Sequence, residues 1–405
     1  MALLVGGDAE AAEAPITDAL AMARALGLRR DEAWALQNLA WIAFTRNQNL
    51  VAEDRLQESM LAFADVGDYG GLSWALGLLG WVRFQEGQLD EAEALVNQIV
   101  DEIDRDGEHW AHAMMVTLSA SIRLWRGETL DAIAQAKVAV SEFDALGDVL
   151  GQLRAKVPLV RGQVAAGRIR EAFATLGAAP DDAPGSPIAT LRFMLALNTA
   201  NVIGDVGWAR SILAGMTEEL ASLQEGFSEF QTQLALLALQ QRDAKDAVAR
   251  LERVLARTPE GSFDGFGQST LSLALSATEE YERAIATAEA VESAQAATYL
   301  DRALAAIARG FAEAHLGQPE ESRAAFGAAA SRVDQTGDVL AQAVVRLAQA
   351  RAMEALSDPQ AAAAQSHAHD RLRELGVEAA GWDAAFCLAA QPGTRQRGER
   401  ERSPL

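Results

Sequence analysis

Cysteine and histidine are scarce in this chain of 405 residues, which has one cysteine and five histidines. The single Cys387 excludes an internal disulfide framework, and its apolar surroundings, WDAAFCLAA, predict a packed helix residue. The closest approach to a metal motif is Glu108, His109 and His112. A zinc site there would need a further ligand from another helix, so surface or packing histidines are the simpler interpretation. We expect neither a metal nor another cofactor.

Long apolar runs are also missing, and the 35 lysine and arginine residues are outnumbered by 57 aspartate and glutamate residues. No stretch approaches the roughly 18 uninterrupted apolar residues of a membrane span, and the start, MALLVGGDAE, lacks the basic region of a signal peptide. The formal net charge of −22 repels phosphate backbones and anionic lipid surfaces. We therefore expect a cytoplasmic protein that contacts neither a membrane nor nucleic acid directly.

Motifs of catalysis are absent as well. The chain has no phosphate-binding loop of the form G-x-x-x-x-G-K-[ST] and no nucleophile elbow. Its many acidic residues occur mostly singly on polar helix faces, as in EEYERAIATAEAVE, where nothing indicates the burial that tunes an acid–base pair. The sequence predicts that the chain is not an enzyme; a helical metal-dependent hydrolase is the least favoured interpretation.

Alanine and leucine dominate what is present, and 50% of all residues are hydrophobic. Tyrosine occurs three times and proline ten times, and the valine, isoleucine and threonine runs typical of strands are absent. Stacked helices that pack through small side chains have this composition. We expect an all-α protein.

Glycines recur every 40 residues at the ends of helical patterns, where they are typical helix C-caps. One series is Gly27, Gly67, Gly107 and Gly147. A second series, half a period out of step, is Gly7, Asn47, Gly87, Gly127 and Gly167. Asparagine can replace glycine there because it tolerates the left-handed conformation. Each repeat therefore contains two helices.

Side chains in the same phase match from repeat to repeat. The large ones are Trp34 and Trp74, Leu36 and Leu76, Leu39 and Leu79, Trp41 and Trp81, Phe44 and Phe84, then Phe63, Ile103 and Phe143. The small ones are Ala52, Ala92, Ala132 and Ala172. Alanine at a fixed place lets two helix backbones approach closely, and the large residues fill the space between successive hairpins.

The stretch LLGWVRFQEGQLDEAEAL at 78–95 resembles the tetratricopeptide repeat, with Leu79, Gly80, Gly87 and Ala92 at the diagnostic places. A second match is HLGQPEESRAAF at 315–326. The resemblance implies an α-solenoid of antiparallel helical hairpins that winds as a right-handed superhelix. Repeats of about 40 instead of about 34 residues resemble the longer-helix variant of bacterial regulatory ATPases.

Three longer phrases extend the resemblance over about 1–390. They are DEAWALQNLAWIAF, ATYLDRALAAIARGFAEAHLGQPEE and LRELGVEAAGWDAAFCLAA. They resemble the C-terminal repeat region of actinobacterial proteins that join a nucleotide-cyclase-like domain to an AAA-type ATPase. This implies a regulatory or sensor module of a signalling ATPase or transcription regulator. Neither the ATPase nor the cyclase activity is carried by these residues.

In the tetratricopeptide family the first helix of each repeat lines an inner concave groove. The positions here that match groove positions are Trp34, Gln37, Trp41, Phe44, Trp74, Trp81, Phe84, Met114, Trp125, Arg154 and Arg161. Together they would form an aromatic groove with a basic end, suited to a peptide or an amphipathic helix. Long helices can instead bury such aromatic residues between hairpins, and the sequence leaves both interpretations open.

The sequence divides into two arrays. Residues 1–177 form an N-terminal array that begins in mid-repeat, and the proline-rich GAAPDDAPGSP predicts a loop at 178–187. A more degenerate array follows at 188–390, with helices around 188–225, 226–257 and 268–296 and a second loop at 258–268. The polar tail 391–405 is expected to be disordered.

We expect a non-catalytic scaffold that binds a protein or peptide partner. The alternative is a sensor that holds a small-molecule effector on its concave surface. Because the first repeat starts in its middle, we expect a fragment or shortened descendant of a longer protein. Its unfinished N-terminal edge could also pair with a second copy as a homodimer.

Overall fold

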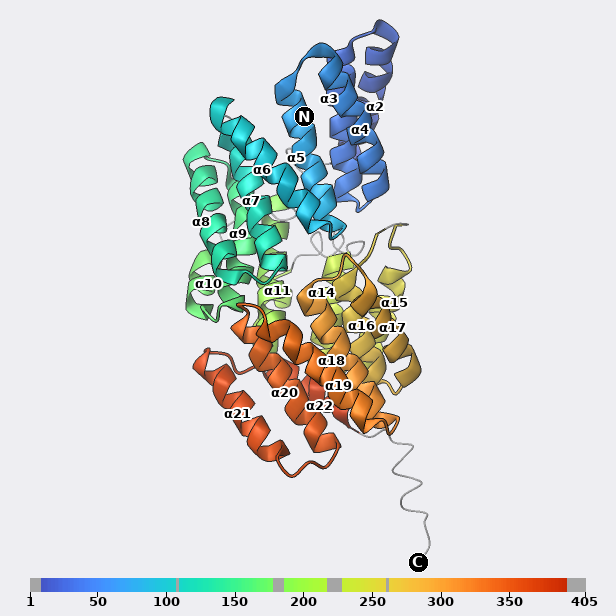
Figure 1. Ribbon diagram of the computed structural model, residues 1–405, viewed down its shortest axis with the longest axis vertical. Helices are drawn as coiled ribbons and strands as arrows, with labels where there is room; N and C mark the ends of the chain where they lie inside the picture. Colours follow the sequence, from blue (N-terminus) through green and yellow to red (C-terminus); the bar gives the residue numbers. More distant parts are fainter. Residues whose placement is uncertain (1–8, 107–108, 178–185, 217–227, 260–261, 392–405) are drawn as a thin grey trace, which may run out of the picture.

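The computed structural model describes residues 9–106, 109–177, 186–216, 228–259 and 262–391, and within them it is helical throughout, with no strand. The helices of the first part are α2 (Ala9–Leu26), α3 (Arg29–Thr45), α4 (Asn49–Val66), α5 (Tyr69–Gln85), α6 (Leu89–Asp106), α7 (His109–Trp125), α8 (Thr129–Leu146), α9 (Val149–Ala165), α10 (Ile169–Leu176), α11 (Pro187–Ile203) and α12 (Val206–Ala214). Those of the second part are α14 (Ser228–Gln240), α15 (Ala244–Leu255), α16 (Gly265–Ala277), α17 (Tyr281–Ser293), α18 (Tyr299–His315), α19 (Pro319–Asp334), α20 (Val339–Ala355), α21 (Ala361–Glu374) and α22 (Ala380–Ala390). Successive helices pair as antiparallel hairpins, an architecture consistent with an α-solenoid (Figure 1).

The predicted turn positions are confirmed wherever the structure describes them. Six glycines of the two series have positive φ angles between 66° and 78°: Gly27, Gly67, Gly87, Gly127, Gly147 and Gly167. Asn47 adopts the same conformation, with φ 60°. Gly7 and Gly107 lie outside the described residues. The glycine period therefore marks the ends of the helices because only these residues enter the left-handed region at little cost.

The repeated alanines are fully buried where helices cross. Ala52, Ala92, Ala132 and Ala172 have no exposed surface, and Phe63 and Phe143 between successive hairpins are equally buried. The first helix of the next hairpin opens with glycine beneath each ring, because a Cβ on Gly71 or Gly151 would lie 2.2 Å from Phe63 or 2.4 Å from Phe143. The two phenylalanines thus fix how closely neighbouring hairpins approach.

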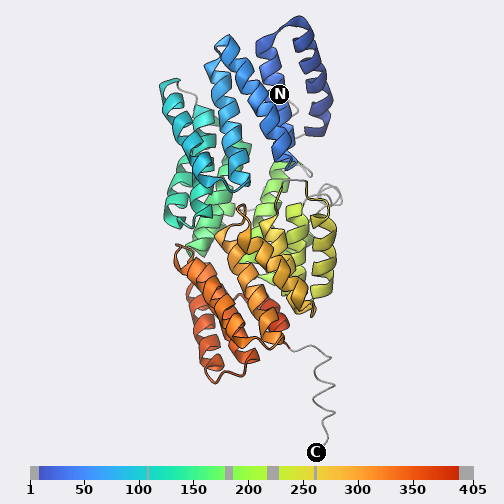
Figure 2. The ribbon, with the colours of Figure 1, turned by 45° about the vertical axis from the view of Figure 1, so that its right-hand side comes forward.

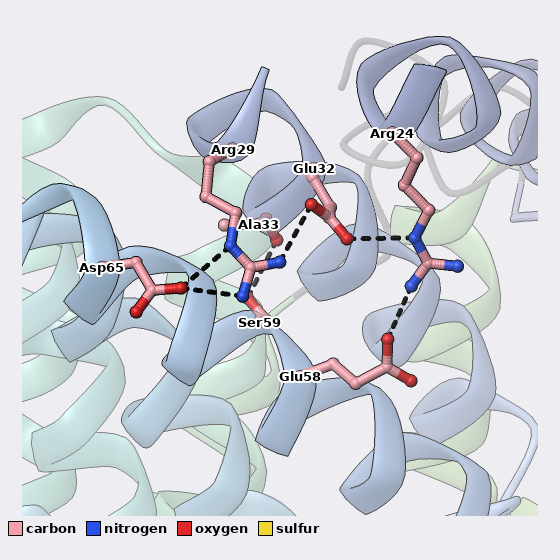
Figure 3. Close-up of polar contacts among 7 residues, drawn as sticks. All are labelled: Arg24, Arg29, Glu32, Ala33, Glu58, Ser59 and Asp65. Atoms are coloured by element: carbon pink, nitrogen blue, oxygen red, sulfur yellow. Dashed lines mark hydrogen bonds and ion pairs between the residues drawn. The ribbon is translucent and has the colours of Figure 1, made fainter. Parts of the chain in front are cut away.

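Polar contacts join the first helices at their surface (Figure 3). Glu32 lies between Arg24 and Arg29, each at 3.0 Å, and Ser59 donates to the carbonyl of Ala33 over 2.8 Å. Arg24 also pairs with Glu58, and Arg29 with Asp65. Most of these side chains are exposed, so the network contributes to helix packing only modestly and does not form a site.

The hairpins follow two curved rows that lie one above the other along the long axis of the molecule (Figures 1 and 2). We call α2–α12 the first array and α14–α22 the second array. The turns inside the hairpins of the first array contact loops of the second array and the start of α22. These contacts join Asn47 to Ser262, Gly87 to Gln295, Gly127 to Gly337, Gly167 to Leu375 and Gly204 to Gly381.

Two of these contacts show how close the arrays come. The hydroxyl of Ser262 donates to the carbonyl of Asn47 over 2.5 Å, across 215 residues of sequence. The backbone N–H of Gly337 donates to the carbonyl of Gly127 over 2.9 Å. The turns at Asn47, Gly87, Gly127 and Gly167 thus meet four successive connections of the second array in the same order. The two arrays form one packed body.

The second half differs in detail from the sequence prediction. The runs expected as helices around 188–225, 226–257 and 268–296 each contain a helical hairpin, broken at Gly204, Arg242 and Glu279. The expected loop at 258–268 is shorter, because α16 already begins at Gly265. Most of the proline-rich loop, 178–185, and the tail beyond Gln391 lie outside the described residues.

Candidate functional site

The first helices of three consecutive hairpins, α3, α5 and α7, surround a hollow on the inner face of the first array. Its cavity volume is about 40 Å³, and it is open to solvent. The lining residues are Gln37, Trp41, Ser73, Trp74, Gly77, Leu78, Trp81, Ile99, Trp110, Ala111, Met114 and Met115. Four tryptophans and two methionines thus bound an apolar depression.

The register of the helices places these side chains together. Trp74 and Trp81 are seven residues apart on α5, two helical turns along one face, and Gly77 lies between them. A Cβ on Gly77 would lie 3.2 Å from Cε of Met115. Met115 therefore packs closely against the backbone at Gly77, and both residues line the hollow.

Stacked rings form one wall. Trp74 and Trp110 stack with centroids 4.9 Å apart and an interplanar angle of 15°. Trp110 also contacts Phe143 edge-on at 6.2 Å, and its indole N–H donates to Asp148 over 2.7 Å. Asp148 is the N-cap residue of α9, so this wall is tied to the next hairpin.

Two polar atoms in the lining have no hydrogen-bond partner within the described part of the chain. They are Oε1 of Gln37, a residue only 6% exposed, and the indole Nε1 of Trp81. Buried polar groups in proteins are nearly always hydrogen-bonded, because an unmade bond costs about 1–3 kcal/mol. Two residues of the lining therefore each carry a buried polar atom, one acceptor and one donor, that has no partner among the described residues.

A cation lies over one of the tryptophans. The guanidinium carbon of Arg154, on α9, is 5.6 Å from the ring centroid of Trp41 on α3. A residue of α9 can reach α3, three hairpins earlier, only if the row of inner helices curves, so this face is concave. The cation–π contact closes one side of the hollow.

The charge of Arg154 has no close counterion. Among the described residues, no carboxylate forms an ion pair or a hydrogen bond with this guanidinium, and Asp148 acts on it only at longer range. Burial lowers the pKa of Arg154 below the usual value of an arginine, and Asp148 opposes the shift. The side chain stays charged at neutral pH because arginine titrates so far above it.

The structure brings together part of the predicted groove. Gln37, Trp41, Trp74, Trp81 and Met114 line the hollow, and Arg154 covers Trp41. The other predicted residues lie elsewhere and are described next.

Trp34 does not line the hollow; it packs edge-on against buried Phe63 at 5.1 Å, between hairpins. Phe44 contacts Trp41 at 6.0 Å, outside the lining. Phe84 lies between Trp81 and Trp125, with the Trp125 ring 4.6 Å away.

Arg161 is an exposed residue that pairs with Glu229 at 3.1 Å. It therefore takes no part in the lining of the hollow, and of the two predicted basic residues Arg154 alone lies at its edge.

Sequence reasoning missed Trp110 and the small or aliphatic residues of the lining. Trp110 is the second residue of α7, and the matching positions in α5 and α9 are Gly70 and Leu150, so no period marked it. Met115 and Ile99 look like ordinary core residues in sequence. The importance of Gly77 follows only from the absence of a side chain at a helix crossing.

Other candidate groups do not form a site. Within the described ranges, no three histidine, cysteine or acidic residues are arranged to hold a metal ion. His112 pairs with Glu142 at 2.8 Å, and Glu108 lies outside the described residues. In the same ranges, no helix combines the length and the apolar character that a bilayer span requires.

Comparison with known proteins adds no assignment. No protein-family model and no curated protein matches the chain.

Proposed function

We propose that the chain is a non-catalytic scaffold that binds a protein or peptide segment in the hollow between α3, α5 and α7. The observation that carries this proposal is the lining itself: four tryptophans surround an open depression, and two lining residues, Gln37 and Trp81, each have a buried polar atom without a partner among the described residues. Interaction hot spots are enriched in tryptophan and arginine, and Arg154 lies at the edge.

The size of the hollow favours a peptide over a small effector. Small-molecule sites have volumes of about 300–1,000 Å³. The cavity here is about 40 Å³, enough for the tip of one side chain. A segment that lies across the open face and inserts a side chain fits this shape, whereas a sensor would have to enclose its effector.

The type of repeat and the handedness of the superhelix are part of the same proposal. We assign the hairpins to the tetratricopeptide type, in a right-handed superhelix, on the phrases at 78–95 and 315–326. The longer phrases support a role as a regulatory or sensor module of an actinobacterial signalling ATPase or transcription regulator. The part of this proposal that can be tested directly is that the aromatic residues of the inner helices bind a peptide.

The test compares two tryptophans in the same helical register. Trp74→Ala removes a wall of the hollow, whereas Trp34→Ala removes a ring that packs against Phe63. We expect Trp74→Ala to abolish the binding of peptides selected on the wild-type chain from a displayed random library. Its stability cost should be the roughly 1 kcal/mol of the lost ring stack plus the contribution of the apolar area that the ring buries, so affinity is compared in the folded fraction.

Trp34→Ala is the control. It should lower the free energy of unfolding by about 3 kcal/mol and leave peptide affinity unchanged in the folded fraction. Affinity is measured by fluorescence anisotropy and stability by denaturant unfolding. Failure to select any peptide whose binding depends on Trp74 would contradict the proposed function.

A further inference from the structure

The inner face of the second array is already filled by a helix of the same chain. Helix α22 packs against α14, α16, α18 and α20, the inner helices of the second array. One helix can contact four members of a row only if it lies inside the curve of that row. In agreement, none of the residues 381–390 is exposed. Helix α22 therefore packs within the second array, with half of the residues 381–390 buried and the other half partly exposed.

Two aromatic side chains and one carboxylate hold α22. Trp382 and Phe386, four residues apart, are both buried, and their rings stack at 5.5 Å. Between them in sequence, Asp383 pairs with Arg351 of α20 at 2.7 Å. The indole N–H of Trp382 donates to the carbonyl of Val202 over 2.7 Å. The pattern is large–acid–x–x–large on one short helix.

The inner face of the first array offers complementary chemistry. Its row of inner helices also curves and also carries an arginine, but within the described residues no helix occupies it. Arg154 lacks the carboxylate that Arg351 has, and Gln37 and Trp81 lack hydrogen-bond partners. The tryptophan lining faces solvent. This face therefore carries an arginine without a carboxylate partner among the described residues, whereas the arginine on the occupied face has one.

We propose that the hollow of the first array binds a short amphipathic helix of a partner protein, one that carries large apolar residues four apart and an acidic residue beside them. The apolar pair seats on Trp41, Trp74 and Trp81, and the acidic side chain pairs with Arg154. This rests on the proposed function and specifies its ligand. The mode is that of a helix laid in a groove.

The charge of Arg154 makes the acid a requirement. A guanidinium that is largely removed from water gains most from a carboxylate, because charge-assisted hydrogen bonds are about twice as strong as neutral ones. The whole chain carries a formal net charge of −22, which disfavours strongly acidic partners. A helix with a single well-placed acid satisfies both conditions.

The experiment starts from peptides of 16 residues selected on the full chain from a displayed random library. The tightest binder is synthesised with each acidic residue replaced in turn by its amide, Glu→Gln or Asp→Asn. On the wild-type chain, one such exchange should lower affinity by about tenfold or more. On Arg154→Gln the same exchange should change affinity by less than about threefold, as a coupled pair requires.

Arg161→Gln is the matched control, since Arg161 lies on the same helix but pairs with Glu229 at the surface. On Arg161→Gln, replacement of the peptide's acidic residue by its amide should lower affinity as much as on the wild-type chain. Arg154→Lys keeps the positive charge, so this variant should retain part of that loss of affinity. Circular dichroism verifies that each variant is folded. The bound peptide should also gain helical signal.

The outcomes separate the two proposals. Peptides that need Trp74 but show no acidic residue coupled to Arg154, or that bind without becoming helical, would leave the scaffold function standing and overturn this inference. Absence of any peptide that depends on Trp74 would overturn both. A concentration-dependent dimer abolished by Trp74→Ala would assign the hollow to a second copy and also overturn the inference.

Discussion

Residues at equivalent positions of this chain play different parts. Trp34 and Trp74 have the same place in successive repeats, yet Trp34 contacts Phe63 and Trp74 stacks on Trp110. The periodic pattern predicted the helix face of both rings. It could not predict their neighbours, because Trp110 has no counterpart in the other repeats. This is why the sequence left groove and core open for the aromatic series.

A buried carboxylate gives the chain a specific pH dependence. Asp338 caps α20 and accepts a hydrogen bond of 2.8 Å from the hydroxyl of Tyr299. Burial raises the pKa of Asp338 from 3.8 to about 6. A carboxyl with a higher pKa in the folded chain binds its proton more tightly there than in the unfolded chain. Its contribution to the free energy of unfolding therefore falls as the pH rises from 3.8 to about 6.

At neutral pH the folded chain must hold Asp338 as a buried, ionised carboxylate, which lowers its stability. We therefore expect Asp338→Asn to raise the free energy of unfolding at neutral pH. Asparagine can still cap the helix. Relative to wild type, the variant should gain roughly 2–3 kcal/mol between pH 4 and pH 7. Denaturant unfolding of both chains across this range measures the difference, in which the contributions of the other carboxylates cancel. A difference that does not vary with pH would contradict the expectation.

Among the elements, the hairpin turns have two roles that the sequence does not separate. Gly127 and Gly147 both adopt left-handed conformations at the end of a helical pattern. A Cβ on Gly147 would meet nothing within 4 Å, whereas one on Gly127 would lie 2.4 Å from Cγ2 of Thr336. Gly147 ends a helix, while Gly127 in addition touches the second array.

This contrast predicts unequal costs for the same substitution. Gly147→Ala should lower the free energy of unfolding by about 1 kcal/mol, the strain of alanine in the left-handed region. Gly127→Ala carries that strain and a steric clash, so it should cost about 3 kcal/mol or more. Thermal unfolding of the two variants beside wild type measures both. Equal losses would mean that the arrays separate easily at this point.

Some helix ends of the second array could not be predicted from the sequence. Glycine marked the turns of the first array, but Arg242 and Glu279 turn the chain in the second, with φ angles of 68° and 69°. Neither residue signals a left-handed conformation, since tertiary packing imposes it. Helix α22 was recognised only as an apolar helical phrase. Its position inside the second array depends on contacts with four helices distant in sequence.

For the molecule as a whole, α22 is the element that closes the second array. It joins the inner helices of that array and reaches the first through Trp382 and the backbone contact between Gly381 and Gly204. Removal of its two buried aromatic rings alone should cost about 3 kcal/mol or more each. Helix α22 therefore adds to the contacts that join the arrays at Asn47, Gly87, Gly127 and Gly167.

A chain truncated after Ala379 should unfold at a lower temperature and bind the dye ANS. The reason is that the apolar inner faces of α14, α16 and α20 would then be open to water. A chain truncated after Gln391, which keeps α22, is the control. If the shorter chain melted as the control does and bound no dye, α22 would be a peripheral helix.

The contacts between the two rows of turns also bear on how such a chain can evolve. Simple solenoids gain or lose repeats freely, because each unit touches only its neighbours. Here Asn47, Gly87 and Gly127 each meet a defined residue of the second array. Duplication of one hairpin in the first array would move every later turn one place past its counterpart. We therefore expect insertion or loss of a single hairpin to be disfavoured, because it would break the contacts between the two arrays.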